Sequence, residues 1–238
     1  MISCSAVACG LGAACAAAAG AIARRSARRG WSFCHPARTR VPASARPEAG
    51  LGDVEDVALR TADGLSLRGW FAPGDRRSVI VFVHGLWGNR LSLLPEARLL
   101  RRRGFGVLLF DSRASGESDG HLATWGDREQ LDVRAAVDFV TARPDVAADG
   151  IVVYGFSVGA SAAAMAVARD PRPRALILCA VWPSFADEIR DKFASFGPLS
   201  WGAAMLAMRR AGIDPDRIRP VDHLGAVSPR PLLLITGT

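Results

Sequence analysis

The fold of this chain is decided by the stretch Ile151-Val152-Val153-Tyr154-Gly155-Phe156-Ser157-Val158-Gly159. Its apolar beginning predicts a buried strand, and the alanine-rich residues 160–169 predict a helix. The G-x-S-x-G run between them is typical of a sharp turn that exposes a serine hydroxyl at the end of a strand. Because only small residues fit beside such a serine, Gly155 and Gly159 are expected to support the turn. Ser157 is therefore the candidate nucleophile.

Apolar runs alternate with helical patterns on both sides of this stretch. Continuous apolar runs predict strands that are buried on both faces, and two shorter runs around Ala62-Asp63-Gly64 predict a hairpin. This alternation indicates an α/β fold, a mostly parallel, doubly wound sheet with helices on both faces. The expected strands are 54–60, 65–71, 78–83, 107–110, 151–154, 175–181 and 231–236, and the expected helices are 91–103, 127–142 and 158–169.

Polar motifs follow three of the expected parallel strands. His84-Gly85-Leu86-Trp87-Gly88 follows the strand 78–83, and Asp111-Ser112-Arg113 follows the strand 107–110. Ser157 follows the third. Ligands of open α/β sheets bind at the carboxyl ends of the strands. We therefore expect these motifs to meet at one active site.

Composition excludes several classes of protein. A half-apolar chain of 238 residues can build one sizeable core and is expected to be a single domain. The net charge is +7, but seven arginines and one acid in residues 1–50 account for nearly all of it, so the domain has no basic footprint for nucleic acid. The five cysteines form no C-x-x-C pair or metal-spaced cluster with histidine, and no metal or cofactor is expected.

The N-terminal segment allows three interpretations. Residues 1–23 carry no charged side chain and are followed by Arg24, Arg25, Arg28 and Arg29. The length suits a membrane anchor that would leave the domain in the cytoplasm. Ala21-Ile22-Ala23 also resembles a secretory cleavage site, and a start codon assigned too far upstream is the third possibility. On the first interpretation, residues 1–29 are the anchor with its arginine cluster, 30–50 a linker and 51–238 the domain.

Together the motifs resemble the α/β-hydrolase superfamily, of the serine aminopeptidase-like or esterase-like kind with an anchoring N-terminus. Ala114 stands where this family usually has glycine. The resemblance spans about residues 51–238 and is carried by Thr61-Ala62-Asp63-Gly64, Val83-His84-Gly85-Leu86-Trp87-Gly88-Asn89-Arg90, Phe110-Asp111-Ser112-Arg113-Ala114-Ser115-Gly116-Glu117-Ser118, Gly155-Phe156-Ser157-Val158-Gly159 and Arg230-Pro231-Leu232-Leu233-Leu234-Ile235-Thr236-Gly237-Thr238.

The resemblance implies a role for each motif. Ser157 would attack an acyl carbonyl, and the backbone N–H groups of Leu86 and Val158 would form the oxyanion hole. His84 and Gly85 would shape the turn that carries Leu86. The expected substrate is a small-molecule ester, thioester or amide, or an acyl or peptide group.

The resemblance also implies residues that the printed chain does not contain. The family order is serine, then acid, then histidine, and Gly237-Thr238 looks like the first half of a Gly-Thr-x-Asp turn. We therefore expect a truncated chain that lacks the triad acid, the last strand, the base histidine and a final helix. His223 is the one histidine after Ser157, and we expect it to lie in a surface connection rather than to act as the base. The strand 232–235 would then be an unpaired, aggregation-prone edge.

The segment 182–230 is expected to form a small lid or insertion. Its aromatic residues either pack this segment onto the sheet or line an acyl pocket, and the sequence leaves both open. They are Trp182, Phe185, Phe193, Phe196 and Trp201. Three functions remain in view: a serine hydrolase working through an acyl-enzyme, an acyltransferase with an acceptor other than water, and an inactive hydrolase-like binding protein or fragment without function.

Overall fold

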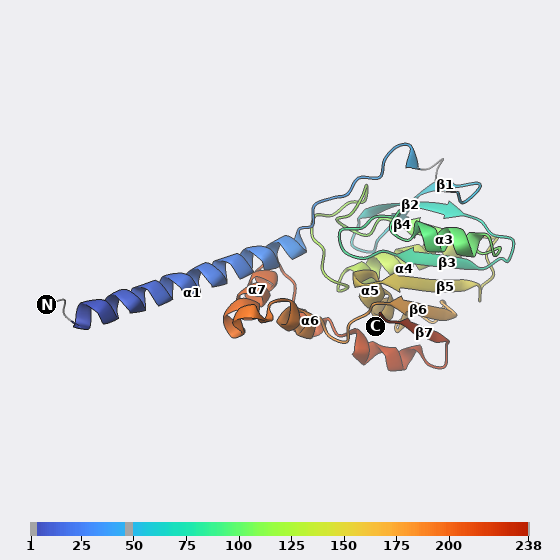
Figure 1. The fold of residues 1–238 in the computed structure, drawn as a ribbon. Coiled ribbons are helices and arrows are strands. Elements are labelled where there is room, and N and C mark those ends of the chain that lie inside the picture. Colours follow the sequence, from blue (N-terminus) through green and yellow to red (C-terminus); the bar gives the residue numbers. More distant parts are fainter. Residues whose placement is uncertain (1–3, 46–49, 238) are drawn as a thin grey trace.

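The computed structural model describes residues 4–45 and 50–237, and its centre is a seven-stranded sheet in the order β1-β2-β4-β3-β5-β6-β7 (Figure 1). The antiparallel pairs are β1 with β2 and β2 with β4, and the remaining neighbours pair in parallel. This confirms the predicted α/β-hydrolase architecture. The strands are β1 (Glu55–Arg60), β2 (Ser66–Ala72), β3 (Val79–Val83), β4 (Gly106–Phe110), β5 (Ile151–Phe156), β6 (Ala175–Cys179) and β7 (Leu232–Ile235).

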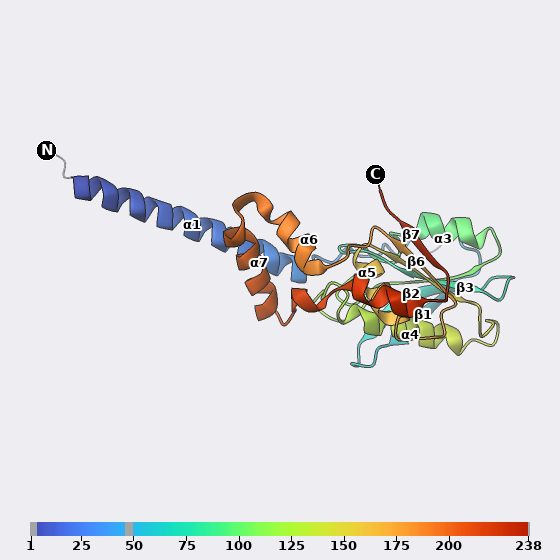
Figure 2. The same ribbon diagram turned by 90° about the horizontal axis from the view of Figure 1, so that it is seen from below.

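Helices cover both faces of the sheet (Figures 1 and 2). On one face α3 (Leu94–Arg101) packs over Ile80, Phe82 and their neighbours. On the other face α4 (Glu129–Thr141) and α5 (Val158–Val167) pack over Val81, Val153 and Leu176. Because the side chains of a strand alternate between faces, the continuous apolar runs fill both cores.

The N-terminal segment is a single long helix, α1 (Cys4–Cys34), whose outer end projects away from the rest of the molecule (Figures 1 and 2). It continues past residue 30, where a linker was expected. The physical reason is tertiary packing: the inner end of α1 lies against α7 (Pro198–Arg210), and Phe33 and Cys34 are buried there. Residues 1–3 and 46–49 of the expected anchor and linker lie outside the described residues.

The expectation of a membrane-spanning anchor is not supported. None of the helices in residues 4–45 and 50–237 combines the length and the apolar character that a membrane crossing requires. In α1 the uncharged part consists largely of alanine and glycine, which contribute little hydrophobicity, and four arginines follow it within the same helix.

The segment 182–230 divides into two parts. Its first part, α6 (Phe185–Lys192), the short helix η1 (Ala194–Phe196) and α7, packs with the inner end of α1 beyond the carboxyl ends of the strands (Figure 1). Its second part, η2 (Pro215–Arg217) and η3 (Pro220–Val227), leads back to β7, and η3 packs beside α5. We call α6, α7 and the inner end of α1, from Ser26 to Cys34, the cap.

Among the described strands, β7 forms one edge of the sheet and pairs with β6 alone. All four of its residues are exposed, including Leu233 at 53%. Thr238, the second residue of the expected Gly-Thr turn, lies outside the described residues.

Candidate active site

Ser157 sits on a strained turn between β5 and α5. Its φ is 53° and its ψ is −117°, a conformation that side-chain-bearing residues rarely adopt. The strain is held in place from both sides, because Ser157 N–H donates to Cys179 O at 2.9 Å and Ser157 O accepts from Ala160 N–H at 2.9 Å. Strained backbone that is fixed in this way is a recurrent property of functional sites.

The glycines on either side of Ser157 are required by close backbone packing. A Cβ on Gly155 would lie 2.5 Å from Ala160 Cα, and one on Gly159 would lie 2.2 Å from Val83 O. Neither contact is sterically possible, so the turn can form only with glycine at both positions. Close backbone packing thus explains why the G-x-S-x-G run has glycine at both of its ends.

The turn places Ser157 at the N-terminus of a helix. Ser157 is the N-cap residue of α5, so the partial positive charge of the helix N-terminus lies beside its hydroxyl. The residue is half-buried, and a substrate therefore has access to it. The backbone N–H of Val158 belongs to the first turn of the same helix.

His84 is buried between two loops of the candidate site. Its Nδ1–H donates to Gly85 O at 2.7 Å, and its Nε2 accepts from Ser112 N–H at 3.0 Å, which fixes the neutral tautomer. Burial lowers the pKa of His84 and reinforces this neutral state. Since both ring nitrogens are engaged, His84 ties the loop after β3 to the loop after β4 and is not free to act as a base.

The two expected oxyanion residues come together. Leu86 and Val158 line the same small hollow, whose volume is about 20 Å³, with His84, Gly85 and Gly159 among their neighbours. Gly85 also lies against the turn at Ser157, because a Cβ there would be 3.3 Å from Ser157 Cβ. The loop after β3 and the start of α5 therefore share one site.

A buried ion pair supports the loop that carries Leu86. Arg90 is 3% exposed and Asp111 0%, and Arg90 Nη2 lies 2.7 Å from Asp111 Oδ2. Asp111 also accepts from the backbone N–H groups of Arg90 at 2.7 Å and Glu117 at 2.9 Å. A Cβ on Gly116 would be 2.1 Å from Asp111 Oδ2, so only glycine fits beneath this carboxylate. The sequence singled out Asp111 but did not identify Arg90 as its partner.

A second buried network holds the loop after β4. Arg113 donates to Asp132 through Nη2 at 2.7 Å and through its backbone N–H at 2.9 Å, and its Nη1 reaches Asp63 at 2.8 Å. Burial raises the pKa of Asp132 to about 7, while the Arg113 guanidinium opposes that shift. Ala114, at the position where glycine was expected, has a φ of 58°, so the network holds a left-handed alanine beside the site.

His223 lies near the end of α5 opposite to Ser157. The pKa of His223 is lowered by burial and by the charge of Arg169, which follows the C-terminal end of α5. Ser157 caps the opposite end of that helix. His121 is exposed and lies in the segment before α4. Among the described residues, no hydrogen bond joins Ser157 to a histidine, and no cluster of His, Cys, Asp and Glu suits a metal ion.

Three of the five aromatic residues singled out in the segment 182–230 pack in one buried cluster at the cap. Trp182, Phe185 and Phe193 are buried in a cluster that also contains Val158, while Trp201 is half-buried at its margin and Phe196 is 59% exposed. Phe33 and Trp125 are the other aromatic residues buried in this cluster, and the sequence analysis missed them both. Trp125 stands between two expected elements, and Phe33 lies in the segment taken for a linker.

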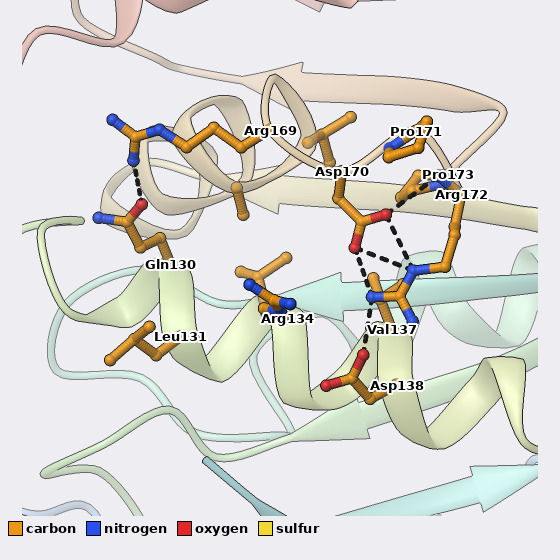
Figure 3. A pocket seen from close by; sticks show the side chains of 13 residues that line it. Gln130, Leu131, Arg134, Val137, Asp138, Arg169, Asp170, Pro171, Arg172 and Pro173 are labelled. Carbon is orange, nitrogen blue, oxygen red and sulfur yellow. Dashed lines mark hydrogen bonds and ion pairs between the residues drawn. The ribbon is translucent and has the colours of Figure 1, made fainter. Parts of the chain in front are cut away.

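A surface hollow of about 350 Å³ lies elsewhere, between α4 and the segment after α5 (Figure 3). Arg172 in its wall is paired with Asp170 at 2.6 Å and Asp138 at 2.7 Å. This hollow adjoins the C-terminal end of α5, away from Ser157. It is therefore separate from the candidate active site.

Sequence comparison relates the chain to known proteins. A family model described as serine aminopeptidase S33 matches residues 74–210. Polyketide transferase ATR5 of Stachybotrys chlorohalonatus is 38% identical over 130 residues, which cover 53% of this chain and 44% of that protein. Uncharacterized protein YfhR of Escherichia coli is 29% identical over 192 residues, which cover 77% of this chain and 62% of that protein. The chain spans about half the length of the curated relatives it matches.

Structure comparison supports the fold. An esterase of Pyrococcus furiosus, Pf2001, superposes with a TM-score of 0.68 at 24% identity and covers 85% of this chain and 77% of its own. The α/β hydrolase GrgF of Penicillium has a TM-score of 0.61 at 22% identity, with coverage of 77% and 80%. Because the family model matches more than half of the residues, the chain belongs to the serine aminopeptidase S33 family of α/β-hydrolase enzymes.

Proposed function

We propose that this protein is a serine hydrolase whose Ser157 attacks the carbonyl carbon of an ester, thioester or amide. The observation that carries the proposal is the strained turn at Ser157, which is enforced by Gly155 and Gly159 and backed by the N-terminus of α5. A turn of this kind holds a hydroxyl away from its own backbone and toward an approaching carbonyl.

In the proposed reaction, the bond between Ser157 Oγ and the acyl carbon forms while the carbonyl oxygen becomes an oxyanion. The N–H groups of Leu86 and Val158 donate to that oxygen, and loss of one such donor typically raises the barrier by about 2.7–4 kcal/mol. His84 acts at a distance by positioning the loop that carries Leu86. Collapse of the intermediate expels the alcohol, thiol or amine, and water then hydrolyses the acyl-enzyme.

Ser157 also requires a base, because a serine hydroxyl is a weak nucleophile at neutral pH. His84 is engaged through both ring nitrogens, and His223 lies toward the other end of α5. We propose that the acid and the base follow β7, as the family order of serine, acid and histidine implies.

A fluorophosphonate probe tests the proposal on the protein expressed from its complete gene. We expect labelling that disappears in Ser157→Ala and persists in Ser161→Ala, a matched serine buried in α5 without a hydrogen-bond partner for its hydroxyl. Labelling that survives Ser157→Ala would refute the proposal. A folded protein that takes up no probe would favour the inactive binding protein instead.

Acyl transfer is the second candidate, and the similarity to two polyketide transferases favours it. Hydrolysis and transfer share the acyl-enzyme and differ in the acceptor. Product analysis by mass spectrometry, with a thioester substrate and added alcohols or amines, separates them: free acid indicates hydrolysis, and a new ester or amide indicates transfer.

A further inference from the structure

The hollow between α4 and the segment after α5 has a deep apolar floor (Figure 3). We call it the α4–α5 hollow. Val133 and Val137 of α4 and Val167 of α5 are no more than 1% exposed, yet all three line it. The hollow therefore extends down between the two helices to the core of the domain. Its volume of about 350 Å³ is within the range of sites that bind small molecules.

The rim of the α4–α5 hollow carries polar side chains from both of its walls. Gln130, Arg134 and Asp138 follow one another at intervals of four residues, so they lie along one face of α4. The facing wall contributes Arg169 beside Gln130 and Arg172 beside Asp138 (Figure 3). A polar rim above an apolar floor suits a ligand with one polar end and an apolar body.

The charges of the rim are paired at one end of the hollow only. Arg172 lies 2.6 Å from the Asp170 carboxylate. At the other end Arg169 donates to the neutral amide oxygen of Gln130, one helical turn from Arg134. In the part of the chain that the structure describes, neither Arg134 nor Arg169 forms an ion pair with a carboxylate. Two guanidinium groups at the same end of the hollow are therefore without an anionic partner.

The wall that carries Arg169 is held in place by Arg230. The Arg230 guanidinium donates to three backbone carbonyl oxygens of this wall. They are Val167 O at 2.8 Å, Asp170 O at 2.7 Å and Pro173 O at 3.0 Å. Because the last carbonyl groups of a helix have no partner within it, these bonds also complete the end of α5. A wall that is already ordered loses little conformational entropy when a ligand binds.

We propose that the α4–α5 hollow binds a small organic phosphate monoester, whose phosphate group pairs with Arg134 and Arg169 and whose apolar body lies on the floor. Guanidinium groups match phosphate oxygens in charge and in geometry. A phosphate monoester carries a charge of about −1.5 to −2 at pH 7, which two guanidinium groups balance. At the other end, Asp138 and Asp170 share the single Arg172, and this excess of negative charge disfavours a second anionic group on the ligand.

Calorimetric titration with 1-naphthyl phosphate tests the proposal on protein from the complete gene. We expect saturable one-to-one binding with a Kd below about 1 mM. Arg134→Gln and Arg169→Gln should each bind at least about tenfold more weakly, because each loses a hydrogen bond between two charged groups. Arg128→Gln is the matched control, since it removes an exposed arginine that precedes α4 and lies outside the hollow, and it should bind like wild type. The melting temperature of each variant without ligand shows that it is folded.

A further variant separates an organic phosphate from free phosphate as the ligand. Ala166→Leu places a larger side chain in the lining of the hollow and leaves both arginines in place. We expect it to weaken the binding of 1-naphthyl phosphate at least about tenfold and to leave the binding of inorganic phosphate unchanged. 1-Naphthol, which has the same apolar body and no phosphate, should bind wild type at least about tenfold more weakly than 1-naphthyl phosphate.

Three results would overturn the proposal. The folded wild-type protein does not bind 1-naphthyl phosphate; or Arg128→Gln weakens binding as much as Arg134→Gln does, which would reduce the effect to general attraction by positive charge. Inorganic phosphate binding as tightly as 1-naphthyl phosphate would assign the hollow to the free ion and not to an organic monoester. None of these measurements involves Ser157, so their outcome is independent of the proposed hydrolase function.

Discussion

At the scale of single residues, position 159 requires glycine because a carbonyl oxygen lies against it, and not because its backbone adopts a conformation reserved for glycine. Its backbone faces Val83 O so closely that any Cβ would come within 2.2 Å. We expect Gly159→Ala to lower the free energy of unfolding by about 1–3 kcal/mol, because β3 or α5 must shift to relieve the overlap. Gly202→Ala is the matched control, since a Cβ there meets nothing within 4 Å and helix α7 should gain about 0.5–1 kcal/mol. Urea denaturation of both variants measures the difference, and equal changes would contradict the steric explanation.

His84 should make stability depend on pH. Its folded-state pKa is lowered by burial, so below its unfolded pKa of about 6.5 the unfolded chain binds more protons than the folded one. The contribution of His84 to the free energy of unfolding should therefore be complete above that pH. It should decrease as the pH drops, by at most about 1.4 kcal/mol per pH unit. Protonation also removes the acceptor for Ser112 N–H.

Urea denaturation between pH 5 and 8 checks this expectation. The loss of stability toward low pH should be smaller in His84→Asn than in wild type, because the variant has no imidazole to protonate. His121→Asn, which changes an exposed histidine, should retain the wild-type profile. If both variants follow the wild-type profile, His84 is not the group that titrates.

At the scale of elements, β7 is the least protected strand. Leu233 is paired in register with Ile177, on the face of the sheet that α3 covers elsewhere, and it is 53% exposed. Exposed apolar edge strands promote pairing between chains. We expect the 238-residue chain to self-associate and Leu233→Lys to reduce the associated fraction in light scattering. Leu206→Lys removes a similarly exposed leucine from α7, away from any strand edge, and should have little effect.

The elements themselves could largely be predicted from the sequence. The strands around residues 78–83, 107–110, 151–154, 175–181 and 231–236 are continuous apolar runs, and a run buried on both faces has few alternatives to a central strand. Their ends differ from the structure by at most two residues, because hydrogen bonds of the flanking loops decide where pairing stops. The turn at Ser157 was predictable for the same local reason, since its glycines are adjacent in sequence.

At the scale of the whole molecule, the features that were missed depend on long-range contacts. Ser26 and Ser200 meet across 174 positions, and Phe33 meets Trp125 across more than half of that separation. No local sequence pattern predicts that two such distant residues come into contact. The same holds for Arg90 and Asp111, which are 21 positions apart. Local patterns therefore predicted the turn at Ser157, whereas the contacts of the cap became visible only in the folded structure.

The N-terminal segment supplies the final prediction. Residues 14–18 of α1 are exposed along the part of the helix that projects from the body, whereas Phe33 and Cys34 are buried in the cap (Figure 1). Removal of residues 2–18 should therefore change the melting temperature by no more than about 2 °C, which corresponds to less than about 1 kcal/mol for a chain of this size.

Removal of residues 2–41 should lower the melting temperature by at least about 5 °C, because it uncovers Trp125 and Phe193 and removes the partner of Trp87 O. The uncovered aromatic rings should also bind the dye ANS, whereas the shorter deletion should not. Calorimetry and dye fluorescence on the two deletions decide the point. If the longer deletion melts like the intact chain, residues 30–41 act as part of a linker, as their composition first indicated, and do not stabilise the cap.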